Sequence, residues 1–314
     1  MSRCVGSATL VFVRRPAVAK IAVGGQALIE GVLMRGPSGI ALCIRKEDGE
    51  LFCEEQVVNA SPTGIWKLPI LRGIFALGQS MKIGLGALNR SSEFFGAGEV
   101  SRWDAWLEKR FGEKLATKIS MALTLMTSVL LAVVFFIALP TLLVGTLQRW
   151  IQVPIVLSLL EGLVKMGLFF AYVLSIRRIP EIHRVFQYHG AEHKAVYNFE
   201  SGKPLSVENA RGFSTLHPRC GTSYVFFVLT LSILFFSFVS WTSPLLRTAL
   251  KIVFLPVVAG LGFELLRFTA KEKPWIRYLR APGMMLQKIT TAEPDDQQLE
   301  VAIEALKRVI PGES

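Results

Sequence analysis

Long apolar runs alternate with charged segments along most of the chain. The clearest run, Ile119 to Leu147, has 29 residues without a charged side chain and is interrupted only by Pro140. A helix rises about 1.5 Å per residue, so about 20 such residues cross a hydrocarbon core about 30 Å thick. Further runs of this kind are Pro154 to Ile176, Tyr224 to Trp241 and Leu245 to Phe263. The pattern predicts a polytopic α-helical membrane protein with about four transmembrane helices.

Four charged side chains fall inside the predicted spans. Glu161 and Lys165 lie one helical turn apart near the middle of the second span, where a lone charge is costly. We expect them to form an ion pair that faces the bundle interior, with a polar pathway or a substrate contact as the functional alternative. Arg247 and Lys251 lie near one end of the fourth span, so we expect them to snorkel toward the membrane surface.

Residues 40–58 alternate between apolar and polar positions around Asp48-Gly49, which is the strongest short signal for a β-hairpin. Cys43 and Cys53 would face each other across this hairpin. Because the four cysteines of the chain include no Cys-x-x-Cys pair, we expect reduced thiols in a cytosol-facing protein. The glycine-rich residues 24–37 are expected to form tight turns and not a phosphate loop.

Two helices are expected outside the spans. Leu68 to Leu88 is apolar but contains Arg72, Lys82 and several glycines, so it is predicted to be an interfacial or re-entrant helix, with a fifth span as the alternative. After Pro294, acidic residues begin an amphipathic helix and basic residues end it. This helix is expected to dock and not to carry chemistry.

The chain has 35 Lys and Arg residues and a net charge of +11. Residues 1–118, 177–221 and 264–314 hold 16, 7 and 8 of these basic residues. Under the positive-inside rule, this distribution predicts that both termini and the middle loop are cytoplasmic. Orientation and attraction to the lipid bilayer account for the charge, so no nucleic-acid partner is expected. The predicted location is a bacterial inner membrane or a plastid-type membrane.

These features divide the chain into six predicted parts. The first is a variable, loosely ordered extension that does not have the pattern of a secretory signal, because its basic residues follow its apolar core. The parts are the extension (1–20), an N-terminal cytoplasmic and interfacial region with the hairpin (21–118), the first helix pair (119–176), a cytoplasmic loop (177–221), the second helix pair (222–263) and a cytoplasmic segment with the amphipathic helix (264–314).

Three of the four histidines and one cysteine fall within 32 residues of the middle loop. A helix would place His189 and His193 on one face, where they could chelate one ion. The motif His-x-x-Glu-His is that of inverse zincins, in which the glutamate, here Glu192, acts in catalysis. His217 and Cys220 follow on a turn that contains proline, and they complete a His₃Cys set suited to Zn²⁺.

Three interpretations of this set stay open. A closed His₃Cys site would be structural and would pin the loop to the membrane face. An open ligand position would permit catalysis. In the third interpretation no metal binds, and the histidines hydrogen-bond to neighbouring groups or to lipid phosphate.

Four stretches make the chain resemble the YqhQ family of bacterial and plastid-related membrane proteins. This is a domain-of-unknown-function family whose members are described as metal-dependent enzymes from their motifs. The stretches are Gly24–Pro37, Val185–Lys194, His217–Ser223 and Thr290–Leu306. The resemblance extends from about residue 21 to residue 306 and implies a polytopic membrane protein with a metal site formed by His189, His193, His217 and Cys220.

The resemblance implies no substrate. Established inverse zincins take a third ligand, usually Glu, from a large soluble domain that is absent here, and the nearby substitutes are Glu200, Glu208 and Glu264. The first predicted function is a metal-dependent hydrolase at the cytoplasmic membrane face, with Glu192 as the general base and a lipid-linked or peptide substrate. The alternative is a scaffold or biogenesis factor with structural zinc and a membrane-protein partner. A transporter ranks third, because the four spans show no inverted repeat.

Overall fold

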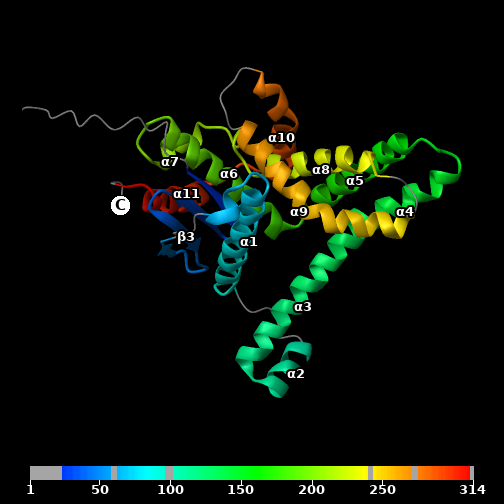
Figure 1. Ribbon diagram of the computed structural model, residues 1–314. Helices are drawn as coiled ribbons and strands as arrows, with labels where there is room; N and C mark the ends of the chain where they lie inside the picture. Colours follow the sequence, from blue (N-terminus) through cyan, green and yellow to red (C-terminus); the bar gives the residue numbers. More distant parts are fainter. Residues whose placement is uncertain (1–22, 58–61, 96–101, 240–242, 270–274, 312–314) are drawn as a thin grey trace, which may run out of the picture.

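The computed structural model describes residues 23–57, 62–95, 102–239, 243–269 and 275–311. Figure 1 shows a small β-sheet covered by helices and, beside it, an elongated bundle of apolar helices. The predicted N-terminal extension, residues 1–20, lies outside the described residues.

The sheet is an antiparallel meander of β1 (Gly24–Leu28), β2 (Gly31–Gly36), β3 (Gly39–Arg45) and β4 (Leu51–Gln56). The predicted hairpin is confirmed as β3 and β4, and Gly49 has the positive φ of 86° that suits its turn. The glycine-rich stretch differs from its prediction, because it forms two strands as well as turns. Pairing with a neighbouring strand outweighs the low strand propensity of glycine there.

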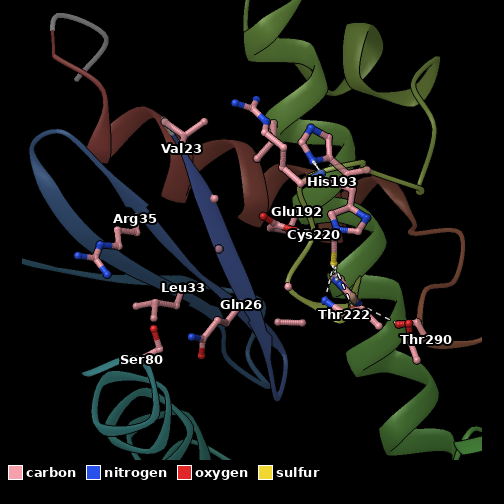
Figure 2. A pocket seen from close by; sticks show the side chains of 18 of the residues that line it. Val23, Gln26, Leu33, Arg35, Ser80, Glu192, His193, Cys220, Thr222 and Thr290 are labelled. Carbon is pink, nitrogen blue, oxygen red and sulfur yellow. Dashed lines mark hydrogen bonds and ion pairs between the residues drawn. The ribbon is translucent and has the colours of Figure 1, made fainter. Parts of the chain in front are cut away.

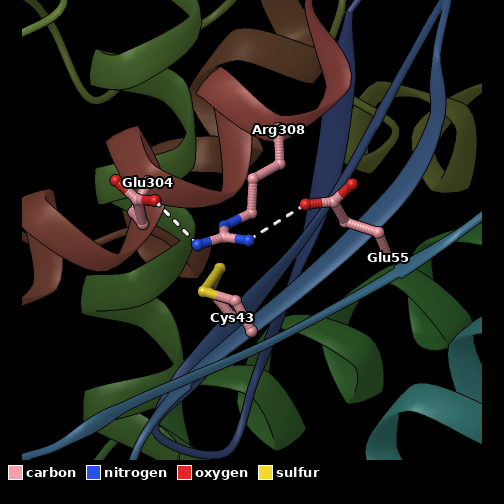
Figure 3. Close-up of a disulfide and its surroundings, with 5 residues drawn as sticks. Cys43, Glu55, Glu304 and Arg308 are labelled. Atoms are coloured by element: carbon pink, nitrogen blue, oxygen red, sulfur yellow. Dashed lines mark hydrogen bonds and ion pairs between the residues drawn. A yellow bond between two sulfur atoms is a disulfide. The ribbon is translucent and has the colours of Figure 1, made fainter. Parts of the chain in front are cut away.

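Cys43 and Cys53 form a disulfide between β3 and β4 (Figure 3). The two residues are directly opposite each other in the antiparallel register, with Cα atoms 4.2 Å apart. The expectation of free thiols is therefore wrong for this pair, because it was based on compartment and not on register. Cys220 is a free cysteine and is buried.

One face of the sheet packs against α6 (Pro180–Glu200) and α11 (Asp296–Val309). α11 is the predicted amphipathic helix, begun by Asp295 in a capping box, and its apolar side chains are buried. Arg308 of α11 lies 2.9 Å from a carboxylate oxygen of Glu55 in β4, beside the disulfide (Figure 3). The helix therefore docks on the sheet of its own chain.

α1 (Leu71–Ser92) follows a short 3-10 turn (Gly64–Lys67) and packs between the other face of the sheet and α9 (Pro244–Thr269). It is helical as predicted. In the part of the chain that the structure describes, α1 is not one of the helices that are long and apolar enough to cross a membrane. Arg72 of α1 forms an ion pair with Glu264 of α9, which joins the sheet region to the bundle.

Three described helices are long and apolar enough to cross a membrane: Leu115–Arg149, α5 (Pro154–Ile176) and α9. They correspond to the first, second and fourth predicted runs. The third run forms α8 (Thr222–Ser237), an apolar helix of 16 residues, and its predicted end at Trp241 lies outside the described residues. The chain is thus a mostly helical membrane protein with three candidate spans, and the fourth span stays a prediction.

The first span changes its hydrogen-bond pattern in front of Pro140. Proline has no N–H group and its ring clashes with the preceding turn, so a π-helical turn forms there. Figure 1 shows that the part of the helix on the N-terminal side of this turn extends away from the bundle. The elements of this region are α2 (Arg102–Phe111), α3 (Glu113–Val133), the π-helical turn (Val134–Ala138), α4 (Leu139–Gly145) and a 3-10 turn (Thr146–Arg149).

The charged side chains inside the spans pair differently from the prediction. Glu161 of α5 forms ion pairs with Lys251 and Arg247 of α9, and not with Lys165. Arg247 and Lys251 are 1% and 4% exposed, so the expectation that they snorkel is wrong. The facing helix brings two cations to the carboxylate, and spacing within one helix cannot reveal such a contact.

Two further helices frame the segment between α6 and α8. α7 (Val207–Arg211) is capped by Ser206 and packs against α6 and α11. α10 (Ile276–Thr290) packs closely against α8 at Gly283. A Cβ atom at this position would lie only 2.4 Å from the hydroxyl oxygen of Ser223.

Candidate metal centre

α6 and the turn before α8 bring three of the four predicted ligands together. His189 and His193 lie one turn apart on α6, with ring centroids 4.5 Å apart, and Cys220 lies beside them. The three candidate ligand atoms all lie within 4.8 Å of one another. The predicted i, i+4 arrangement on a helix is confirmed, and it is the reason that both rings project from one face.

Backbone carbonyl groups orient both imidazoles. The Nδ1–H group of His189 donates to the carbonyl oxygen of Thr290 at 2.9 Å, and that of His193 donates to the carbonyl oxygen of Thr215 at 2.5 Å. Each Nε2 atom therefore keeps its lone pair. The Nε2 atom of His193 is buried and has no hydrogen-bond partner among the described residues. Metal-ligating histidines are commonly held in this way.

The sulfur of Cys220 lies 3.2 Å from Nε2 of His189. The backbone N–H of Thr222 donates to this sulfur at 3.3 Å, and the Thr222 hydroxyl lies 3.2 Å from it. The thiolate is the form of cysteine that binds metal ions.

Glu192 lies between the two histidines on α6 and is 6% exposed. Its Oε2 atom is 3.4 Å from Nε2 of His193, so the carboxylate borders the ligand cluster. β1 passes close to it at Gly25, where a Cβ atom would lie 3.0 Å from Cγ of Glu192 and 2.5 Å from the carbonyl oxygen of Leu33. Glycine is required for this close approach.

His217 lies near the cluster but is not directed at it. Its ring centroid is 5.7 Å from that of His193, its Nε2 atom is 3.5 Å from a carboxylate oxygen of Glu200, and its Nδ1 atom accepts from the N–H of Arg219. Burial lowers the pKa of His217, which keeps the ring neutral at neutral pH. The fourth predicted ligand is thus beside the other three, and its role as a ligand stays a prediction.

The alternative carboxylate ligands lie away from the cluster. Glu200 pairs with Arg219, Glu264 pairs with Arg72, and Glu208 is exposed on α7. None of the three carboxylates belongs to the ligand cluster that the described residues form.

Residues that sequence analysis did not single out hold the site in place. The buried side chain of Gln287 in α10 accepts from the N–H of His217 at 2.8 Å and donates to its carbonyl oxygen at 3.0 Å. Gly190 lets Ala292 approach α6, because a Cβ atom at Gly190 would lie 2.1 Å from the Ala292 carbonyl oxygen. The position of Gly190 inside the histidine motif was a signal of close packing, whereas nothing in the sequence marks Gln287.

Ion pairs and a hydrogen bond connect the region of the histidine motif to two of the other stretches that carry the family resemblance. Glu30, in the turn after β1, pairs with Arg184 and accepts from the Tyr188 hydroxyl at 3.2 Å. Lys194 is 3% exposed and pairs with Glu293, in the segment before α11. The separate motifs of the sequence are therefore parts of one site.

A pocket of about 1090 Å³ adjoins the cluster (Figure 2). Its volume is that of a site for a sizeable small molecule. The walls come from β1, β2, α1 and α6, and also from the apolar helices α5 and α8. Lining side chains include Leu33, Ile83, Phe169 and Val225, together with the basic Arg35 and Arg219.

Comparison with known proteins agrees with these motifs. A family model described as "Protein of unknown function (DUF1385)" matches residues 68–312. The chain is 34% identical over 294 residues to "Uncharacterized protein YqhQ" of Bacillus subtilis (strain 168), and the match covers 92% of each chain. No solved structure matches the chain. The resemblance inferred from the motifs is thus confirmed, and the chain belongs to the DUF1385 family and is a relative of YqhQ.

Proposed function

We propose that the protein is a zinc-dependent hydrolase that acts at the cytoplasmic membrane face on a lipid-linked substrate. One observation carries the proposal: the buried Nε2 atom of His193 has no hydrogen-bond partner among the described residues, yet it lies with two other ligand atoms and beside a carboxylate. Two imidazoles and a thiolate form a donor set that suits Zn²⁺.

The number of ligands supports a catalytic site over a closed one. Catalytic zinc sites use three protein ligands and leave the fourth position to water or substrate, whereas structural sites are closed by four. His189, His193 and Cys220 provide three ligands, and His217 is engaged with Glu200 instead.

Glu192 is the candidate general base. A bound zinc ion would act as a Lewis acid on water and on the carbonyl or phosphoryl group to be cleaved. Glu192 would accept a proton from the attacking water at Oε2, the atom 3.4 Å from Nε2 of His193, and would then donate it to the leaving group. Because Glu192 is 6% exposed, few bulk water molecules compete for this proton.

The pocket favours a lipid-linked substrate over a peptide. Phe169 and Val225 belong to the apolar helices α5 and α8, so one wall of the pocket continues the bundle that meets the bilayer. Arg35 also lines the pocket and suits an anionic head group. An acyl or prenyl chain would remain against the apolar wall while the head group reaches Glu192.

A structural role for the metal is the second candidate, in a non-enzymatic scaffold or biogenesis factor. It is favoured by the closeness of His217, whose ring centroid is 5.7 Å from that of His193. If the His217 side chain turned away from Glu200, the site would have the four ligands of a closed centre.

Replacing Glu192 with Gln distinguishes the two functions. In a hydrolase, the Glu192→Gln protein should accumulate normally and keep its zinc, but it should not complement a deletion of the gene, because the base is lost. His193→Ala and Cys220→Ala should release zinc and lower abundance in either case.

Zinc content of the detergent-purified protein and complementation at matched abundance are the measurements. Glu208→Gln and His183→Ala are matched controls, because both residues lie outside the cluster, and they should behave like the wild type. Full complementation by Glu192→Gln would exclude the hydrolase and leave the scaffold, and purified wild-type protein without zinc would exclude both.

A further inference from the structure

One carboxylate and three basic side chains are buried together inside the helix bundle. Glu161 is 3% exposed, and Lys165, Arg247 and Lys251 are 7%, 1% and 4% exposed. All four belong to α5 and α9, two of the helices that can cross a membrane. Uncompensated charge is expensive in such a place, so the positive excess requires a physical explanation.

Local contacts compensate two of the three cations. Lys251 forms an ion pair with Glu161 and a hydrogen bond of 2.8 Å with the Thr141 hydroxyl. Arg247 donates to the carbonyl oxygens of Phe236 at 2.9 Å and Val239 at 2.6 Å. The Phe236 carbonyl group is at the C-terminal end of α8, which carries the negative end of the helix dipole, and Val239 follows that end.

Lys165 is the cation that remains. It has no hydrogen bond or ion pair with any described residue, although it is 7% exposed. It lines a cavity of about 10 Å³ together with the other three charged side chains and the apolar Ile233 and Phe236. A cavity of this size holds about one molecule or ion of the size of water.

We propose that this cavity binds a single small monovalent anion, such as chloride, between Lys165 and the two basic side chains of α9. Glu161 and the three basic side chains have a formal charge of +2, so one bound anion would lower the charge of the cluster to +1. The small volume would exclude larger anions such as sulfate or gluconate. This site is separate from the candidate metal centre, and the inference does not depend on the proposed function.

Thermal unfolding of the full chain in detergent tests the site. Chloride replaces gluconate at constant ionic strength, and the midpoint should rise with the logarithm of the chloride concentration above the dissociation constant. Sulfate should give no such rise. In Lys165→Met, the dependence on chloride should be lost, because the cation that has no local partner is removed. In Glu161→Gln, half-maximal stabilisation should need less chloride, because the cluster has gained positive charge.

Lys118→Met is the matched control, because Lys118 is exposed on α3, and it should keep the wild-type response. A wild-type midpoint that is equal in chloride and gluconate would overturn the proposal, and so would a chloride response that persists in Lys165→Met. If Lys165→Met does not accumulate, Lys165→Gln takes its place and the wild-type titration still decides.

Discussion

The candidate metal centre depends on single residues that contribute no ligand atom. Thr215 and Thr290 orient the two imidazoles through their carbonyl groups, and Gln287 holds the backbone of His217. Gly190 lets the segment after α10 approach α6 near the histidines. The preorganisation of the site is therefore set by packing around α6 as much as by its ligands.

Gly190→Ala should destabilise the protein by about 1–3 kcal/mol or more, because the new Cβ atom would overlap the carbonyl oxygen of Ala292. The thermal unfolding midpoint in detergent and the zinc content check this expectation, and both should fall. Gly86→Ala on α1 is the matched control, because no atom lies within 4 Å of its added Cβ atom. That change should raise the midpoint slightly, because alanine favours the helix. Equal effects of the two changes would contradict the packing argument.

Among the elements, α5 and α9 are joined by an ion pair that crosses the bundle. Glu161 forms ion pairs with Lys251 and Arg247, whereas Lys165, one turn away on α5, has no ion pair with a described residue. A buried pair fixes the relative position of two helices, because separating them would strand a charge in an apolar surrounding.

Glu161→Gln should cost about 3–5 kcal/mol, because it leaves Lys251 buried without its carboxylate. The double variant Glu161→Gln with Lys251→Met should be less destabilised than Glu161→Gln alone. Thermal midpoints in detergent measure both effects. Glu50→Gln, which breaks the exposed pair with Lys46, should change stability by about 1 kcal/mol or less. Additive losses in the double variant would show that the two side chains are not coupled.

In the whole molecule, the sheet, its disulfide and the candidate metal centre form one unit beside the bundle. The charge distribution predicts that this unit is cytoplasmic, whereas disulfides are more common in oxidising compartments. The two features depend on different properties. The charge of the loops acts during membrane insertion, whereas a disulfide depends on the register of the two cysteines and on the local redox potential.

Topology reporters fused at residues 150 and 243 should be extracytoplasmic, and reporters at both termini should be cytoplasmic, because the basic residues concentrate in the terminal and middle segments. Alkaline phosphatase and green fluorescent protein fusions report the two sides. A cytoplasmic signal at residue 150 or 243 would exclude the four-span arrangement.

Thiol labelling tests the disulfide. In air-purified, denatured Cys4→Ser protein, one cysteine should react with maleimide before reduction and three should react afterwards, because Cys43 and Cys53 are joined and Cys220 is free. Mass spectrometry counts the labels. Three labels before reduction would show that the pair is a dithiol in the purified protein.

The sequence by itself was sufficient for the apolar helices, the hairpin, the amphipathic C-terminal helix and the pairing of His189 with His193. Each of these features follows from a local periodicity of apolar residues, from a short residue spacing or from a short turn sequence, and such patterns determine local geometry. The family assignment also came from contiguous motifs.

Only the tertiary structure decided the partners of these elements. It paired Glu161 with Lys251 across two helices, turned His217 toward Glu200 and placed Cys43 opposite Cys53. Each of these contacts depends on the relative position of segments that no local period specifies. Strand register, helix crossing and the side chain that fills a given space are set by packing of the whole chain, because many distant residues compete for the same neighbours.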